Sequence, residues 1–278
     1  MLKGYKYRLH PTPAQAELLI KTIGCAQFIY NKLLEDRIAI REEAKAGIVT
    51  RRKPATPASY KPLFPFLAEA GKFFISILVE QDDEPWIPAE NKVGIDLGLD
   101  HFAVMMNDAM VSEKIENPRF LRQSEAKVKK AQRALSRKKI GSKNREKAKL
   151  LLAKKHEKIA NQRQDFLHKL SRRIVDENQV IVVETLTSKD MMKNHKVAKS
   201  IGDVSWYEFV RQLEYKCTFY GRTLIKADPW YASTQICSTC GVKGEKKTMD
   251  VREWTCTHCG AYHDRDINAS LSLLMLAD

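Results

Sequence analysis

Two pairs of cysteines near the C-terminus have the spacing of a metal site. Cys237 and Cys240 form one C-x-x-C pair, Cys256 and Cys259 form another, and 15 residues separate the two pairs. Each pair offers two thiolates from one tight turn, and two such turns complete the four-cysteine tetrahedron that is typical of structural zinc. Zinc binding of about 10 kcal/mol would stabilise a segment this small, which has little core of its own.

Other interpretations of these cysteines explain less. His258 and His263 are alternative ligands for the same ion. A redox role is less consistent with the sequence, because two pairs at this spacing account for each other, and paired cysteines fit a metal site in a reducing compartment better than a disulfide framework. Cys25 and Cys217 stand alone in helical patterns, and we interpret them as buried small hydrophobic residues.

Three acidic residues occupy positions where a carboxylate needs a partner. Asp96 lies within the apolar run VGIDLGL, Glu184 ends the apolar run VIVVE, and Asp266 opens the last predicted helix. A carboxylate at such a place is costly unless it is paired or binds a metal ion. Carboxylate oxygens suit Mg²⁺ or Mn²⁺, and three converging carboxylates can hold two such ions about 4 Å apart for the hydrolysis of a phosphodiester bond.

Each of these acids alone is a weak signal. VGIDLG also fits the phosphate loop of actin-like ATPases, but such an enzyme needs a second glycine-rich loop and an adenosine motif, and neither is evident in the sequence. Asp264 competes with Asp266, although it could serve only as the cap of the last helix. We prefer Asp266, which lies further into the helix beside the small residues Ala269 and Ser270.

The positive charge of the chain is concentrated in one segment. The chain has a net charge of +14, and residues 122–173 alone contain 19 Lys and Arg against 4 Asp and Glu. This excess indicates a nucleic-acid partner, because helices stabilised by i,i+4 ion pairs would contain more acids. A membrane surface is a weaker alternative, since the segment lacks aromatic anchors apart from Phe166. We expect phosphate contacts from Lys127, Lys130, Arg133, Arg137, Lys138, Lys139, Lys143 and Arg145.

Apolar periodicity predicts the elements that position these residues. Short apolar runs predict strands at 2–9, 71–80, 92–100, 179–186 and 222–228, with a hairpin at 101–116. Helical periodicity predicts helices at 14–45, 206–220 and 267–277, and a long basic hairpin of helices at 120–176. From Val93 onward, this order favours a mixed α/β sheet covered by helices.

Composition sets the remaining limits. The chain is 44% apolar, has no apolar run near 18 residues, and begins without a signal-peptide pattern. We therefore expect a soluble cytoplasmic protein without a membrane partner. Trp206, Tyr207 and Trp230 could stack on bases, but core packing is the preferred interpretation.

The ordered set of motifs resembles one family. VGIDLGLDHFAV, IVVETLTSKDM, DPWYASTQICSTCG and HDRDINASLSLL look like the RuvC-type nuclease of transposon-encoded TnpB (OrfB) proteins, and residues 1–34 resemble their N-terminal segment. The resemblance implies an RNA-guided DNA endonuclease with a ribonuclease H-like fold, with guide RNA and target DNA as partners. It also implies a prokaryotic protein that is associated with the nucleoid. Carried over residue by residue, it makes Asp96, Glu184 and Asp266 the catalytic acids that hold Mg²⁺ or Mn²⁺, and the four cysteines a structural zinc ribbon.

The resemblance also implies how the chain is divided. We expect a nucleic-acid-binding region at 1–80, a linker at 81–92, the nuclease at 93–228, the ribbon insert at 229–262 and the last nuclease segment at 263–278. Family members are longer between 64–70 and 71–80, where they carry more of a helical recognition region and several barrel strands. Those parts hold the guide and read the DNA motif beside the target, so the N-terminal half is expected to be reduced, with the shortening near Ala70-Gly71. The oligomeric state is not indicated.

Three functions remain open from the sequence. The first is the metal-dependent, RNA-guided endonuclease. The second is a binding protein without cleavage, such as a regulator of transposition or a remnant; the intact set of acids argues against it and the shortened half argues for it. The third is an unguided nuclease of the RuvC type that acts on single-stranded or branched DNA.

Overall fold

The computed structural model divides the chain into two compact units, Met1–Asp83 and Glu84–Asp278, and the boundary falls within the segment expected to be a linker. Its described residues are 2–23, 38, 66–69, 72–80, 89–187, 191–195, 197–248 and 250–277. Residues 13–23 are helical, in agreement with the start of the helix predicted at 14–45; most of that helix lies outside the described residues.

The first unit contains a sheet of three antiparallel strands in the order β1-β3-β2. Strand β1 (Leu2–Leu9) pairs with β3 (Lys72–Glu80), and both were predicted from the sequence. Strand β2 (Phe66–Glu69) was not predicted; it pairs with β3 so that Glu69 lies opposite Lys72. The strands on the two sides of Ala70-Gly71 are therefore hydrogen-bonded neighbours, at the place where the sequence indicates shortening.

The second unit is built on a five-stranded mixed sheet in the order β6-β5-β4-β7-β8. The central strand β4 (Lys92–Leu97) is antiparallel to β5 (His101–Asn107), which pairs with β6 (Ser112–Glu116). On its other side β4 is parallel to β7 (Val180–Val183), and β7 is parallel to β8 (Thr223–Lys226). Residues that follow β4, β7 and β8 consequently meet at one edge of the sheet, here called the carboxyl edge.

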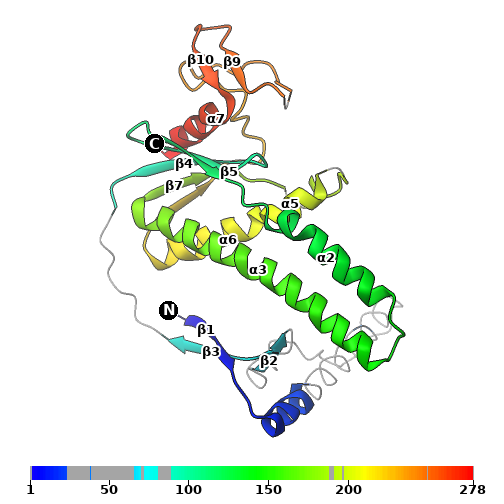
Figure 1. Cartoon of the computed structure of the whole chain (residues 1–278). Coiled ribbons are helices and arrows are strands. Elements are labelled where there is room, and N and C mark those ends of the chain that lie inside the picture. Colours follow the sequence, from blue (N-terminus) through cyan, green and yellow to red (C-terminus); the bar gives the residue numbers. More distant parts are fainter. Residues whose placement is uncertain are drawn as a thin grey trace, which may run out of the picture. The chain divides into compact units, whose positions relative to one another are not determined.

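Helices cover both faces of this sheet (Figure 1). The predicted basic hairpin consists of α2 (Phe120–Ser136) and α3 (Lys143–Glu177); α3 packs with α6 (Trp206–Phe219) on one face, and α7 (Arg265–Leu274) lies on the other. A short helix that the sequence patterns missed, α5 (Ala198–Val204), precedes α6. None of the described helices is long and apolar enough to cross a membrane.

Strand β4 sends alternate side chains to the two faces, as a strand must. Val93, Ile95 and Leu97 enter the core formed with α3 and α6. Gly94 lies on the opposite face, where an added Cβ would be 2.2 Å from the carbonyl oxygen of Ser270 in α7. Only glycine permits this close approach, which packs the second half of α7 directly against β4.

The cysteine segment folds beside α7. It contains a two-stranded antiparallel sheet of β9 (Glu253–Thr255) and β10 (Tyr262–Asp264), which the sequence analysis did not predict. Strand β10 runs directly into α7, which begins two residues earlier than predicted and is followed by a 3₁₀ turn at Met275–Ala277. The fold of this segment therefore determines where the first turn of α7 lies.

Candidate active site and cysteine cluster

The four cysteines of the two C-x-x-C pairs converge as predicted. Their sulfur atoms all lie within 4.8 Å of one another, which suits a metal ion such as zinc. Gly241 and Gly260 follow the pairs with φ of 71° and 74°, where a side chain would strain the turn. Backbone N–H groups of Cys259 and His258 lower the pKa of Cys256 to about 6, whereas burial and the neighbouring thiols raise the pKa values of Cys240 and Cys259, so the four thiols share their protons until a cation binds.

The two histidines that the sequence offered as alternative ligands differ in position. The Nε2 atom of His263 lies 3.1 Å from the sulfur of Cys237, and its ring lies 4.8 Å from that of Trp254. His258 is exposed. The group of ligand atoms that converges here consists of the four cysteine sulfurs and includes no histidine, so His263 lies beside the cluster.

Asn268 connects the cysteine segment to α7. Its side chain is buried; Oδ1 accepts a hydrogen bond from the backbone N–H of Ser238 (2.9 Å), and Nδ2 donates to the carbonyl of Ile236 (2.7 Å). Ser238 belongs to the first cysteine turn, and Asn268 lies two residues after Asp266. The amide thus fixes the cysteine cluster relative to the start of α7.

We expect Asn268→Ala to lower the free energy of unfolding by about 2–3 kcal/mol, because it leaves the buried N–H of Ser238 without a partner and removes the shorter of two hydrogen bonds to the Ile236 carbonyl. Chemical denaturation of the metal-loaded protein measures this loss. Ser272→Ala is the matched control, since the Ser272 hydroxyl makes only a longer 3.3 Å hydrogen bond to the same Ile236 carbonyl. Equal losses in the two variants would contradict a specific role for the amide.

The structure brings the three predicted acids to the carboxyl edge of the sheet. Asp96 lies on the face of β4 that carries Gly94, and Glu184 directly follows β7. The parallel register pairs Ile95 with Val183, so Asp96 and Glu184 are neighbours on adjacent strands. Asp266 lies in the first turn of α7, which packs on this face. The acids are more widely spaced than the cysteines, whose ligand atoms form the tighter group.

Burial and mutual repulsion dominate the electrostatics of these acids. Burial raises the pKa of Asp96 well above its usual value, and the charges of Glu184 and Asp266 raise it further. Burial likewise raises the pKa of Glu184 to about 7, although its Oε1 accepts a 2.5 Å hydrogen bond from the backbone N–H of Leu97. Without a bound cation, the site therefore favours protonated carboxyl groups.

The raised pKa of Glu184 predicts that the stability of the protein depends on pH when Mg²⁺ and Mn²⁺ are absent and the cysteine cluster keeps its zinc. The folded state holds the proton of Glu184 up to about pH 7, whereas the unfolded chain releases it near pH 4.5. The free energy of unfolding, relative to that of Glu184→Gln, should therefore fall by roughly 3 kcal/mol between these pH values and then level off. Urea denaturation without added Mg²⁺ or chelator measures the difference, and parallel pH profiles of the two proteins would contradict it.

Asp264, the rival of Asp266 in the sequence, has the capping role considered for it. Its Oδ1 accepts hydrogen bonds from the backbone N–H groups of Asp266 and Ile267, each 3.0 Å long. Its Oδ2 pairs with Lys114 at 2.7 Å. Burial alone would raise the pKa of Asp264, but these hydrogen bonds and the Lys114 charge hold it below its usual value. Asp264 thus starts α7 and orients Asp266.

Sequence patterns missed Arg252, which contacts one of the acids. This residue precedes β9 in the cysteine segment, and its Nη1 lies 3.5 Å from Oδ2 of Asp266. Its Nη2 pairs with Asp100 in the turn after β4. No local pattern could reveal the Arg252–Asp100 pair, because its two residues are 152 positions apart.

The residues proposed for phosphate contact lie on α2, on α3 and in the turn between them. Seven are exposed, whereas Arg145 is partly buried. The Arg145 guanidinium donates to the carbonyls of Leu135 and Lys138, at 3.2 and 3.1 Å, and so helps to close the turn. Phosphate contact by these eight side chains stays a prediction. Arg145 also has a structural role in the turn.

The three aromatic residues considered for base stacking fall into two groups. Trp206 is buried, as core packing requires. Tyr207 and Trp230 are 76% and 91% exposed, so core packing was the wrong interpretation for these two. The backbone N–H of Trp230 donates a hydrogen bond to the Asp228 carboxylate, which fixes the loop that carries the indole. Both rings are exposed and could stack on a base of a bound nucleic acid.

Three family models match the sequence. A model described as "Probable transposase" (OrfB, IS605 type) matches residues 76–195, a "Cas12f1-like, TNB domain" matches 206–273, and a "Helix-turn-helix domain" of OrfB proteins matches 1–46. Among solved structures, the chain is similar to Cas12f in a ternary complex, with a TM-score of 0.51 and 21% identity over 73% of this chain and 42% of that one. That likeness shows a shared fold.

Two curated relatives extend the comparison. A Streptomyces pristinaespiralis protein named "Putative RNA-guided DNA endonuclease" is 34% identical over 98% of this chain and 88% of its own length. Its alignment extends over 361 positions, so it contains residues with no counterpart among the 278 here. The Escherichia coli protein of the same name, InsQ, is 30% identical over 73% of this chain, which spans about half of that relative. The chain therefore belongs to the TnpB (OrfB) family of transposon-encoded proteins, which includes relatives named as RNA-guided DNA endonucleases.

Proposed function

We propose that this protein is an RNA-guided, metal-dependent DNA endonuclease whose active site consists of Asp96, Glu184 and Asp266. The observation that carries the proposal is that three carboxyl groups lie at one edge of the sheet, close enough for their charges to repel one another. Burial and this repulsion raise the pKa values of Asp96 and Glu184. A cluster of this kind destabilises the fold, and it is retained where charge is needed for chemistry. The names of the family relatives supply the substrate class, DNA, and the guide, RNA.

The topology supports a ribonuclease H-like fold of the RuvC type. Three antiparallel strands are followed by two parallel ones on the other side of β4, and the acids lie on β4, after β7 and at the start of α7. In this arrangement the bond to be cleaved would lie at the carboxyl edge, beside the three acids. The four-cysteine segment is then a zinc ribbon inserted before the last element of the nuclease.

The donor set fits Mg²⁺ or Mn²⁺. Carboxylate oxygens are the ligands that these ions prefer, and Asp96, Glu184 and Asp266 would hold them. When bound there, such ions supply a water of lowered pKa and neutralise charge at the leaving oxygen of the phosphodiester. The Leu97 N–H orients the Glu184 carboxylate, the Asp264 cap orients Asp266, and Arg252 places a positive charge where the anionic phosphate would lie.

The guide is tested by expressing the protein with the DNA that flanks its gene and sequencing the RNA that copurifies with it. A single discrete RNA is the expected result. The purified complex should then cut DNA that matches this RNA when Mg²⁺ or Mn²⁺ is present, and it should leave unmatched DNA intact. Random cellular RNA, or cleavage that persists after the RNA is removed, would contradict guided cleavage.

A second function, nucleic-acid binding without guided cleavage, is favoured by one observation. The chain lacks residues that the Streptomyces relative contains, and the strands on the two sides of Ala70-Gly71 pair directly. If the absent residues hold the guide, the protein is a remnant or a regulator of transposition. Tight DNA binding with no cut product in either metal ion would support this alternative over the endonuclease.

A further inference from the structure

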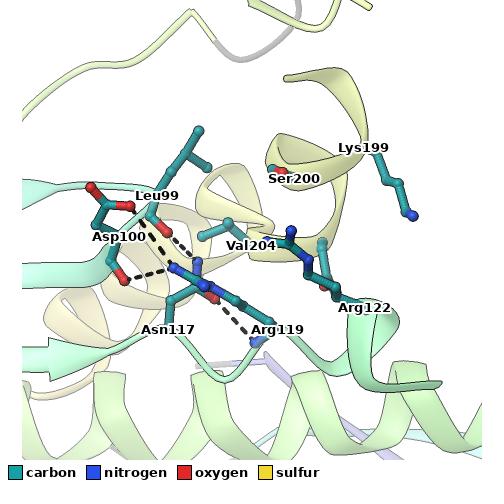
Figure 2. A pocket seen from close by; sticks show the side chains of 9 residues that line it. Leu99, Asp100, Asn117, Arg119, Arg122, Lys199, Ser200 and Val204 are labelled. Atoms are coloured by element: carbon teal, nitrogen blue, oxygen red, sulfur yellow. Dashed lines mark hydrogen bonds and ion pairs between the residues drawn. The ribbon is translucent and has the colours of Figure 1, made fainter. Parts of the chain in front are cut away.

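A pocket of about 400 Å³ adjoins the carboxyl edge of the sheet (Figure 2). It lies between the turn after β4, the start of α2 and helix α5. The side chains around it come from these separate elements: Leu99, Asp100, Asn117, Arg119, Arg122, Lys199, Ser200, Asp203 and Val204. A pocket of this size is large enough for a small ligand or for one unit of a longer one.

The two acids that line the pocket are each shared by more than one donor. Asp100 pairs with Arg119 at 3.9 Å and with Arg252. Asp203 is largely buried; it pairs with Arg163 at 3.1 Å and accepts hydrogen bonds from two backbone N–H groups at the start of α2. These carboxylates are therefore already neutralised by their own neighbours and leave little negative charge in the pocket.

The cations exceed the acids here. Glu125, which flanks the pocket on α2, is shared by Lys129 and Lys199, and their hydrogen bonds lower its pKa to about 2. Arg122 points from the first turn of α2, and its guanidinium has no acidic partner among the residues that the structure describes. Three cationic side chains, Arg119, Arg122 and Lys199, thus line the pocket against two carboxylates that have further cationic partners outside it, an arrangement that attracts an anion.

We propose that this pocket binds a backbone phosphate of the nucleic-acid strand that crosses the acids, with Arg122 as the main contact and Arg119 and Lys199 beside it. Guanidinium groups bind phosphate oxygens in pairs, and a phosphate can replace a shared carboxylate as the partner of Arg119. Asp100 links the pocket to the acids, because its second partner Arg252 lies 3.5 Å from Asp266. The inference rests on the proposed function, which supplies the strand.

The test combines a protein variant with single neutral phosphates in the ligand. Binding of a short single-stranded DNA is measured without Mg²⁺ or Mn²⁺, using versions in which one phosphate at a time is a methylphosphonate. Arg122→Ala should weaken binding roughly 10-fold. It should also reduce the slope of the logarithm of the binding constant against the logarithm of the salt concentration by about one, the value for one lost phosphate contact. At one position only, the neutral phosphate should weaken the wild type but cause no further loss in Arg122→Ala.

Matched variants separate this contact from general charge. Arg137→Ala removes the same group about 20 Å further along α2, and it should not couple to the same phosphate. Arg122→Lys should keep the salt dependence. Additive losses at every phosphate, or an Arg122→Ala variant that binds like the wild type, would overturn the proposal.

Two further ligands identify the source of the phosphate. The same scan with single-stranded RNA shows which strand occupies the pocket; coupling to RNA but not to DNA would assign the pocket to the guide and overturn its placement on the cleaved strand. Thymidine monophosphate tests a free nucleotide, and coupling of Arg122 to it alone would overturn the assignment to a strand. All of these measurements record binding without Mg²⁺ or Mn²⁺. They can therefore be interpreted even if the protein does not cleave DNA.

Discussion

Replacing Asp96 with Asn should abolish Mg²⁺-dependent cleavage of DNA and make the metal-free protein more stable. Asp96 is buried among like charges, so its carboxylate is costly to the fold until a cation neutralises it. The amide keeps the shape and removes the charge. We expect a cleavage rate at least about 1,000-fold lower, equivalent to about 4 kcal/mol, and unfolding free energy higher by about 1–2 kcal/mol, which raises the melting temperature by several degrees.

Gel assays of cleavage and thermal melts with and without Mg²⁺ measure the two effects together. Mg²⁺ should raise the melting temperature of the wild type and not that of Asp96→Asn, because the variant has lost a ligand. Asp165→Asn is the control, since Asp165 is an exposed partner of Lys169 on α3 and its loss should change neither property. Cleavage that survives in Asp96→Asn would sink the assignment of the active site, and a lower melting temperature would show that the carboxylate supports the metal-free fold.

The sequence predicted the elements whose signal is local. Strands β4 and β7 are continuous apolar runs bounded by turn residues, and the basic hairpin breaks at Gly141, whose φ is 80°. Acids inside or at the end of such runs stand out, because a buried charge needs a reason to be there. The two C-x-x-C pairs likewise carry their geometry in their spacing. For these reasons, the carboxyl edge and the cysteine cluster could both be located before the fold was known.

What the sequence did not reveal depends on contacts between distant segments. Arg252 reaches Asp266 and Asp100 only because the cysteine segment folds back over the turn after β4. The sequence alone does not show why residue 94 has to be glycine, because the reason is the contact of its backbone with α7. Strand β2 and helix α5 are short, and their form is determined by their neighbours more than by their own periodicity. Exposure of Trp230 also follows from tertiary structure, since an apolar residue type alone favours burial.

Removing zinc, or replacing Cys256 with Ser, should unfold the cysteine segment and abolish cleavage while the core of the second unit stays folded. The segment has two short strands and few buried apolar side chains, so metal binding of about 10 kcal/mol would be its main source of stability. The core formed by β4, β7, α3 and α6 contains none of the cluster cysteines. Loss of the segment releases Arg252 and the Asp264 cap, and with them the position of Asp266.

Three measurements on Cys256→Ser and on the chelated wild type check this expectation. Metal analysis should find one zinc per wild-type chain and little in the variant, and limited proteolysis should cut between residues 229 and 262 while sparing the rest of the second unit. Cys217→Ser is the matched control: Cys217 is buried in the α6 core, where burial raises its pKa to about 11, and its replacement should lower stability but keep the zinc. A Cys256→Ser protein that keeps its zinc and its cleavage activity would show that the cluster does not position Asp266.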